Sequence, residues 1–203
     1  MVHLPPHAAG LVIGLLGGSF DPPHAAHRAV SLLAMKRLKL DQVWWVVSPG
    51  NPLKDTRALP PLAERIAAAR ALARHPRIAV TGIEADIGTR FTVDTLRALK
   101  RRCPGVRFVW LAGADVLAEF HRWRNWHAIF RLVPIAFVDR GGVGLRALAG
   151  PAAWAFRASR LPESEAGGLA RHRPPAWIFL HGLKSPASST ALRGKSAGAA
   201  RLK

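Results

Sequence analysis

The sequence predicts an α/β fold, a doubly wound, Rossmann-like parallel sheet flanked by helices. Short apolar runs typical of buried strands alternate with longer helical patterns from Gly10 onward. The 203 residues are 49% hydrophobic and 21% charged, which is typical of a globular chain. This length suits one domain over residues 1–203, with its core at about 11–193 and a basic tail at 194–203.

The elements are expected in a regular order along the chain. Because each is a short apolar run, strands are predicted near 11–17, 42–48, 77–81, 107–112, 133–138 and 176–180. Helical spacing predicts helices near 24–38, 61–74, 91–102 and 115–131, with a short one after 188. Segment 141–173 has the weakest pattern and is expected to wrap the surface as an irregular helix. A sheet of this kind binds its ligands beyond the carboxyl ends of its strands.

A glycine turn and two histidines follow the first predicted strand. The turn includes Gly18, Ser19 and Phe20, and its glycines let a polyphosphate approach the main chain closely. The helix that follows offers backbone N–H groups and a partial positive charge at its start. His24 and His27 lie at i and i+3 on one face of that first turn, so both imidazoles can donate to one phosphate group. These residues predict a site for a nucleoside triphosphate.

The loop after the second strand reads SPGNPLK and ends at Lys54. A lysine on a loop that faces a phosphate site is a mobile point charge able to neutralise an oxyanion. The alternative is an ordinary solvated lysine, and the position after a strand's carboxyl end favours the functional interpretation. Asn51 in the same loop is a candidate substrate-binding residue.

Two later segments each begin a predicted helix. Thr92 is the expected N-cap of the first, and capping alone would explain it. In the second, Gly113 permits a close backbone approach, while Asp115 can cap the helix or accept hydrogen bonds from ribose hydroxyls. Trp123 offers a flat face for stacking on an electron-poor ring. Core packing is the alternative, and it is the preferred interpretation for Trp126 and the remaining tryptophans.

Near the end of the chain, three hydroxyl residues precede a short predicted helix. They are Ser188, Ser189 and Thr190, and they provide both a cap and a second anion-binding helix start. Arg193 follows about one turn later and can grip phosphate oxygens. The bland alternative is a capped helix without a ligand.

These motifs resemble the signatures of the nucleotidylyltransferase superfamily. GSFDPPHAAH at 18–27 matches its GxFxPxH pattern followed by xxH, with Ala26 where the family often has Gly. TVDT at 92–95, and GADVL at 113–117 followed by Trp123, are similar to elements of bacterial nicotinate-nucleotide adenylyltransferases. SSTALR at 188–193 resembles their ISSTxxR signature, with Ala187 in place of Ile.

The resemblance implies a nucleotidylyltransferase-type fold and a reaction of NAD biosynthesis. In that reaction, nicotinate mononucleotide attacks the α-phosphorus of ATP, producing nicotinate adenine dinucleotide and pyrophosphate. It implies catalytic roles for His24, His27, Lys54 and Arg193, and Mg²⁺ carried by ATP without a dedicated metal site. The implied ATP-binding residues are Gly18, Ser19, Phe20, His24, His27, Gly113, Asp115, Ser188, Ser189, Thr190 and Arg193. The implied substrate-binding residues are Asn51, Lys54, Thr92 and Trp123.

Two alternatives to this function stay open at the level of sequence. The nearer one is another adenylyltransferase of the superfamily, acting on nicotinamide mononucleotide or phosphopantetheine. The distant one is an RNA-binding protein, because the formal net charge of +18 favours anionic partners. The basic residues are, however, scattered along the chain with no compact basic arm, so nucleic acid is not the expected partner.

Further features bound the compartment and the chemistry. Cys103 is the only cysteine, so the chain forms no intramolecular disulfide and no thiolate metal cluster, and the thiol is expected to be inert. The N-terminus lacks a signal-peptide pattern, and the apolar runs are too short to cross a bilayer. We therefore expect a cytoplasmic enzyme with no membrane partner. An isologous homodimer is compatible with the sequence, but no feature requires it.

Overall fold

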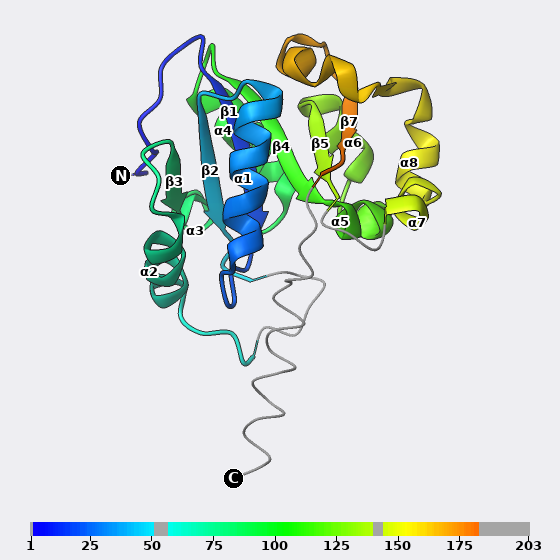
Figure 1. The fold of residues 1–203 in the computed structure, drawn as a ribbon. Coiled ribbons are helices and arrows are strands. Elements are labelled where there is room, and N and C mark those ends of the chain that lie inside the picture. The colour runs from blue at the N-terminus through cyan, green and yellow to red at the C-terminus, as the bar shows by residue number, and fades with distance from the viewer. Residues whose placement is uncertain (1, 51–56, 140–143, 183–203) are drawn as a thin grey trace.

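A computed structural model of the chain describes residues 2–50, 57–139 and 144–182. In these ranges seven strands form one all-parallel sheet in the order β3-β2-β1-β4-β5-β7-β6 (Figure 1). The strands are β1 Val12–Gly18, β2 Gln42–Val47, β3 Ile78–Thr81, β4 Arg107–Gly113, β5 Ile135–Val138, β6 Arg160–Leu161 and β7 Trp177–Leu180. The predicted α/β fold with a parallel sheet is confirmed.

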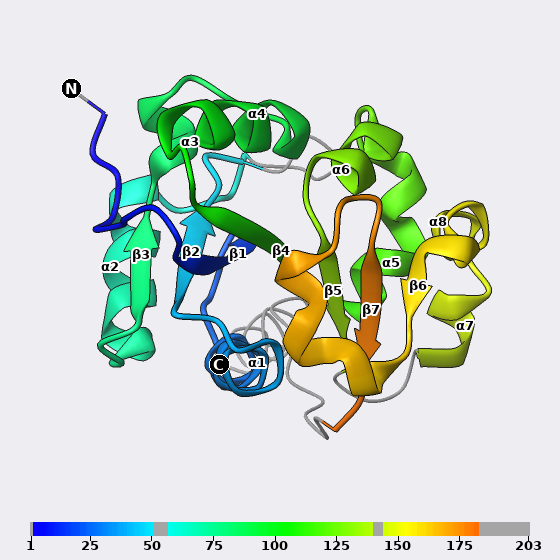
Figure 2. The same cartoon turned by 90° about the horizontal axis from the view of Figure 1, so that it is seen from above.

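The direction of strand addition reverses at β1. The chain adds β2 and β3 on one side of this strand and then crosses to β4, β5 and β7 on the other (Figure 2). Leu15 of β1 is paired with Trp44 on one side and with Trp110 on the other. Sheets of this type bind ligands in the crevice beyond the carboxyl ends of the strands, at the point of reversal. The glycine turn after β1 lies at that point.

Helices cover both faces of the sheet. They are α1 Ala25–Leu38, α2 Leu62–Ala73, α3 Ile83–Asp86, α4 Thr92–Arg102, α5 Ala114–Glu119, α6 Trp126–Leu132, α7 Gly144–Leu148 and α8 Pro151–Ala155, with 3-10 turns η1 Phe120–Arg122, η2 Arg157–Ser159 and η3 Glu163–Arg171. One apolar cluster packs α1, α2 and η3 against one face of the sheet. A second cluster packs the helices from α3 through α8 against the other face. In Figure 2, α1 lies across the sheet from α3 and α4.

Strand β2 shows why the strands read as continuous apolar runs. Val43, Trp45 and Val47 pack in one cluster, while Trp44 and Val46 pack in the other. Successive side chains of a strand point to opposite faces, and both faces of this sheet are covered. The five buried positions at 43–47 therefore all favour an apolar side chain.

The expected helix at 115–131 is wrong in one respect, because it is broken in the middle. Helix α5 ends at Glu119 and α6 begins only at Trp126. Between them the backbone of Trp123 is extended, and Asn125 adopts the left-handed conformation with φ of 50°. Trp123 stacks on the fully buried Phe120 with ring centroids 4.7 Å apart. Phe120 also packs edge-on against Phe137 of β5, so packing against the sheet outweighs the helical spacing in the sequence.

Segment 141–173 also differs from the single irregular helix expected there. Its described part holds α7, α8, η2, η3 and the edge strand β6, which pairs in parallel with β7. A strand of two residues carries no periodic pattern, so the sequence could not predict it. The short helix expected after 188 and the tail at 194–203 lie outside the described residues.

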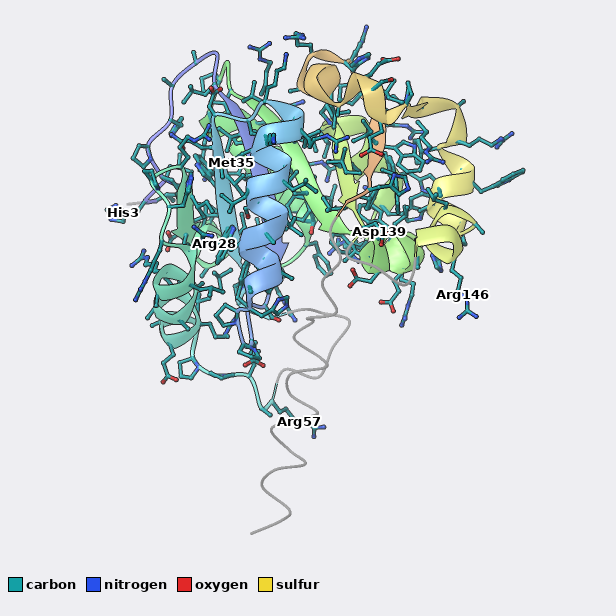
Figure 3. The ribbon with its side chains drawn as sticks, viewed as in Figure 1. His3, Arg28, Met35, Arg57, Asp139 and Arg146 are labelled. Carbon is teal, nitrogen blue, oxygen red and sulfur yellow. The ribbon has the colours of Figure 1, made fainter. Side chains whose placement is uncertain are left out.

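Basic side chains on different elements take part in different contacts. Arg28 of α1 donates from Nε to the Ala73 carbonyl at the end of α2, at 3.2 Å. Arg37 forms an ion pair with Glu163 at 2.7 Å. Arg146 extends from α7 at the edge of the molecule (Figure 3). These arginines serve the surface and the packing of neighbouring elements, and they do not form one continuous stripe. Among the described residues, no helix combines the length and the apolar character needed to span a membrane.

Removing the side chain of Trp177 is expected to lower the free energy of unfolding by about 3 to 5 kcal/mol. The Trp177 side chain is 1% exposed, packs edge-on against Phe137, and donates from Nε1 to the Phe156 carbonyl at 2.7 Å. Urea denaturation of Trp177→Ala measures the loss. Trp154→Ala is the matched control, because Trp154 is 67% exposed and should cost little. Equal losses in the two variants would contradict this account of the core.

Candidate active site

The turn after β1 is shaped by two aromatic contacts. A Cβ atom at Gly17 would lie 2.5 Å from Cη2 of Trp110, so only glycine fits against the β4 indole. Phe20 has a left-handed backbone with φ of 49°, which costs about 1 kcal/mol for a residue with a side chain. Its buried ring stacks on Trp45 at 5.1 Å, and this packing offsets the cost. Gly17 and Phe20 therefore favour a sharp turn whose backbone stays close to the carboxyl ends of the strands.

His24 and His27 form a close pair at the start of α1. His24 is the N-cap residue, and its backbone N–H donates to Nδ1 of His27 at 3.2 Å. The two ring centroids are 3.9 Å apart, and the His24 side chain is buried. Because Nδ1 of His27 accepts a hydrogen bond, the neutral ring carries its proton on Nε2. The two imidazoles therefore lie side by side at one helix start, and their role as donors to phosphate stays a prediction.

A cavity of about 370 Å³ lies beyond the carboxyl ends of β1, β2 and β4. This volume is within the range of small-molecule sites. Of the residues that the sequence singled out, nine line it: Gly18, Ser19, Phe20, His24, His27, Thr92, Gly113, Asp115 and Trp123. The structure therefore brings the first, middle and tryptophan motifs to one place.

The other predicted site residues lie outside the described residues. They are Asn51, Lys54, Ser188, Ser189, Thr190 and Arg193. Their roles stay predictions. Ser48 and Gly50, which precede the first two of them in the chain, line the cavity.

The helix start at Thr92 differs in detail from the expectation. The N-cap of α4 is Phe91, and Thr92 is the first helical residue, so the predicted capping role of Thr92 is wrong. Phe91 reaches the helix in an extended conformation and sits under the guanidinium of Arg124, whose Cζ is 4.5 Å from the ring centroid. Phe91, Thr92 and Arg124 all line the cavity. This places the start of α4, with its partial positive charge, on the wall of the cavity.

Trp123 and Trp110 form an aromatic corner of the cavity. Their rings meet edge to face with centroids 6.2 Å apart, and Phe120 supports Trp123 from the core. The indole Nε1 of Trp110 is buried and has no hydrogen-bond partner among the described residues. Trp126 packs against Phe130 and Phe156, as the core interpretation predicts. Trp154 is the exception among the tryptophans taken as structural, since it is mostly exposed.

Glu84 is a cavity residue that sequence reasoning missed. It lies in the short helix α3, is 5% exposed, and accepts a hydrogen bond from the Thr95 hydroxyl at 2.9 Å. Thr89 and Thr95 hydroxyls are also 2.9 Å apart. Burial raises the pKa of Glu84 to about 7, and the hydrogen bond from Thr95 opposes part of that rise. The segment GIEAD carries no motif, so only the fold reveals this carboxyl group.

The raised pKa of Glu84 predicts a pH-dependent stability. The folded protein holds a proton on Glu84 up to about pH 7, whereas the unfolded chain releases it near the ordinary value of 4.5. Stability should therefore fall as the pH rises through this window, by up to about 3 kcal/mol. Glu84→Gln should remove that part of the slope and be the more stable protein at pH 8. Urea unfolding of both proteins at pH 5 and pH 8 measures the effect. An equal change in the free energy of unfolding between the two pH values in both proteins would refute it.

Arg65 is a second residue that the sequence did not single out. It is buried on α2, with 3% exposure, and its guanidinium donates hydrogen bonds to four backbone carbonyls. Burial lowers the pKa of Arg65, and the charge of Asp21 opposes that change. The sequence of α2, LAERIAAARALA, also contains Arg70, and nothing in it separates the buried arginine from the exposed one.

Neither a protein metal cluster nor a reactive thiol is found in the described part of the chain. No three histidine, cysteine, aspartate or glutamate side chains there are placed to hold a metal ion. Cys103 is buried at the end of α4, and burial raises the pKa of its thiol. A raised pKa disfavours the thiolate, which agrees with the expectation of an inert residue.

Comparisons with known proteins agree with this geometry. The cytidylyltransferase-like family model matches residues 15–195. A Cereibacter sphaeroides protein named "Probable nicotinate-nucleotide adenylyltransferase" is 57% identical over 183 residues, covering 90% of this chain and 96% of the relative. A Bradyrhizobium protein of the same name is 59% identical over 181 residues, covering 89% of this chain and 94% of the relative.

A solved structure shows the same fold at much lower sequence identity. It is the Plasmodium falciparum nicotinic acid mononucleotide adenylyltransferase complexed with NaAD, with a TM-score of 0.67 and 18% identity. The match covers 91% of this chain and 83% of the other. The sheet order, the helix start after β1 and the curated relatives lead to one conclusion: this chain is a nucleotidyltransferase and belongs to the nicotinate-nucleotide adenylyltransferase family.

Proposed function

We propose that this protein is a cytoplasmic enzyme of NAD biosynthesis that transfers the adenylyl group of ATP to nicotinate mononucleotide. The products are nicotinate adenine dinucleotide and pyrophosphate. The observation that carries the proposal is a single cavity lined both by the histidine pair at a helix start and by Trp123. A phosphate site and an aromatic face on one cavity suit a reaction that joins two nucleotides.

The histidine pair and the turn after β1 act on the triphosphate. The main chain at Gly18 and Ser19 cradles phosphate oxygens, and Phe20 holds the turn in shape. His24 and His27 donate to the α- and β-phosphates as negative charge builds in the transition state. Transfers of this type depend on in-line placement and charge stabilisation, so no protein nucleophile is needed.

The acceptor nucleotide binds on the other side of the cavity. Trp123, supported by Phe120, stacks on the pyridine ring. The main chain at the start of α4, around Thr92, helps to hold the ring, and the positive end of that helix favours its carboxylate. The 5′-phosphate oxygen then attacks the α-phosphorus, the new P–O bond forms, and the bond to pyrophosphate breaks.

The remaining predicted residues complete this scheme. Ser189, Thr190 and Arg193, with Ser188 as part of the same cap, hold the β- and γ-phosphates that leave as pyrophosphate. Lys54 neutralises charge from the loop after β2, and Asn51 binds substrate in that loop. Gly113 and Asp115 bind the ATP ribose, since both line the cavity at the start of α5. ATP would carry Mg²⁺ on its phosphates, where the ion would neutralise their charge. The described residues include no cluster of carboxylates placed to hold it.

Pyrophosphate release with different acceptors tests the function. With ATP and Mg²⁺, the protein should release pyrophosphate rapidly with nicotinate mononucleotide, and more slowly with nicotinamide mononucleotide or phosphopantetheine. Faster turnover with one of the latter acceptors would assign a different member of the superfamily. No turnover with any acceptor, together with steeply salt-dependent RNA binding in a gel-shift assay, would favour a nucleic-acid-binding function instead.

A further inference from the structure

Arg65 joins the two loops that form one wall of the cavity. Its Nη1 donates to the carbonyl of Ser19, in the turn after β1, at 2.7 Å. The same nitrogen donates to the carbonyl of Ser48, in the loop after β2, also at 2.7 Å. Its Nη2 donates to the Pro49 carbonyl at 3.2 Å, and its Nε donates to the Pro60 carbonyl at 2.9 Å. One guanidinium therefore ties together three separate stretches of backbone.

The burial of this charge is not explained by core packing. Burying an ionised group is costly unless hydrogen bonds replace its water shell, and an apolar side chain of similar size would fill the space on α2 at less cost. The planar guanidinium offers five N–H donors in a fixed fork, which suits several carbonyls at once. The hydrogen bonds of Arg65 therefore indicate that its function is to hold these backbone segments in place.

Two of the carbonyls bound by Arg65, those of Ser19 and Pro49, set the direction of the amide group that follows. Ser48 and Pro60 are each followed by a proline, which has no N–H, so their contacts only hold the chain in place. In a trans peptide the C=O of one residue and the N–H of the next point in opposite directions. Holding the Ser19 carbonyl on the α2 side therefore directs the Phe20 N–H to the opposite side, and holding the Pro49 carbonyl does the same for Gly50. Both Phe20 and Gly50 line the cavity.

A backbone hydrogen bond already connects these loops. The Ser48 N–H donates to the Gly18 carbonyl at 2.9 Å, which continues the pairing of β1 with β2. That bond fixes the separation of the two loops at their base. The contacts of Arg65 lie beyond it, at Ser19 and Pro49, where the chain leaves the sheet.

We propose that Arg65 is a positioning residue that aims the Phe20 and Gly50 amide groups at the phosphates of ATP. It touches neither substrate, and it acts through the carbonyls of Ser19, Ser48 and Pro49. This inference rests on the proposed adenylyl transfer for the identity of the ligand. The inference explains why the proposed phosphate site has its shape before ATP binds.

Three variants and two binding measurements test the proposal. Arg65→Met removes the guanidinium and its donors but keeps most of the side-chain volume. Arg65→Lys keeps the positive charge but replaces the planar guanidinium by a compact ammonium group. Arg70→Met, on the exposed side of the same helix, is the matched control. The dissociation constants of Mg·ATP and of nicotinate mononucleotide are measured separately by calorimetry. Hydrogen exchange of peptides covering residues 16–24, 45–50 and 62–73 then reports on the turn after β1, on the start of the loop after β2, and on α2.

Arg65→Met is expected to weaken ATP binding by about tenfold or more and to change mononucleotide binding by less than about twofold. Arg65→Lys should be intermediate, and Arg70→Met should resemble the wild type. Faster exchange in Arg65→Met should be confined to the turn after β1 and the loop after β2. If Arg65→Met does not fold, the same split between ATP and mononucleotide in Arg65→Lys decides the matter.

Two results would overturn the positioning role. One is a folded Arg65 variant that binds ATP as tightly as the wild type. The other is an equal loss of affinity for ATP and mononucleotide with faster exchange throughout α2, which indicates a purely structural residue. ATP binding is measured without the acceptor, so the test still reports on Arg65 should the acceptor prove to be a different compound.

Discussion

Replacing His24 by alanine is expected to lower kcat by about 100- to 1,000-fold, with a much smaller change in the binding of nicotinate mononucleotide. The imidazole lies at the N-cap of α1, against the ring of His27, on the wall of the cavity. Its hydrogen bond to a phosphate oxygen strengthens as charge builds in the transition state, so its loss affects turnover more than ground-state binding. Steady-state kinetics with each substrate varied in turn measures both quantities.

The control for this variant must separate chemistry from folding. His24 is buried and caps a helix, so circular dichroism and thermal unfolding are recorded for the same preparation. His3→Ala changes an exposed histidine near the N-terminus and should leave kcat unchanged. Because the two imidazoles act on one triphosphate, the double variant at 24 and 27 should lose less than the product of the single losses. Wild-type turnover in a folded His24→Ala protein would refute the assigned role.

Replacing Trp123 by alanine is expected to raise the KM for nicotinate mononucleotide by about 5- to 150-fold, the range that corresponds to a lost stacking interaction of about 1–3 kcal/mol. The KM for ATP should change little, since the triphosphate is held on the other side of the cavity by the turn after β1. Trp123 is supported by Phe120 in the core and meets Trp110 at its edge. Loss of its indole therefore removes the flat surface that the pyridine ring needs.

Two further variants make this result specific. Trp123→Phe keeps an aromatic face and should recover most of the affinity for nicotinate mononucleotide. Trp154→Ala removes a tryptophan that is exposed and does not line the cavity, so it should leave both KM values unchanged. An equal rise in the KM for ATP and for the mononucleotide would indicate that Trp123 supports the fold of the α5–α6 region and is not a stacking surface.

Much of the fold was predictable because its strands are buried on both faces. The run QVWWVV of β2 predicts a strand without any motif. Helices cover both faces of the sheet, so side chains on both faces of this strand are buried and apolar. The break between α5 and α6 was not predictable. At the break Trp123 stacks on Phe120, and Asn125 adopts a left-handed conformation. Phe120 in turn packs edge-on against Phe137 of β5, a contact that forms only when the sheet is assembled.

The residues of the candidate site also fall into those that the sequence predicts and those that only the fold reveals. Local spacing was enough to place His24 and His27 on one helix start, because residues three apart on a helix share a face. Glu84 and Arg65 could not be found in that way, since their roles come from burial and from partners up to 46 residues away. A carboxyl group in GIEAD and an arginine in an alanine-rich helix look ordinary until the fold surrounds them.

The amino-acid sequence by itself determined the alternation of strands and helices, the glycine turn after the first strand and the family to which this chain belongs. These features depend on short-range patterns, namely apolar runs, glycines and histidine spacing, which act over a few residues. Only the tertiary structure decided which arginine ties the two loops together and which carboxyl group at the cavity has a raised pKa. Those properties depend on desolvation and on hydrogen bonds between segments that meet only when the sheet is assembled.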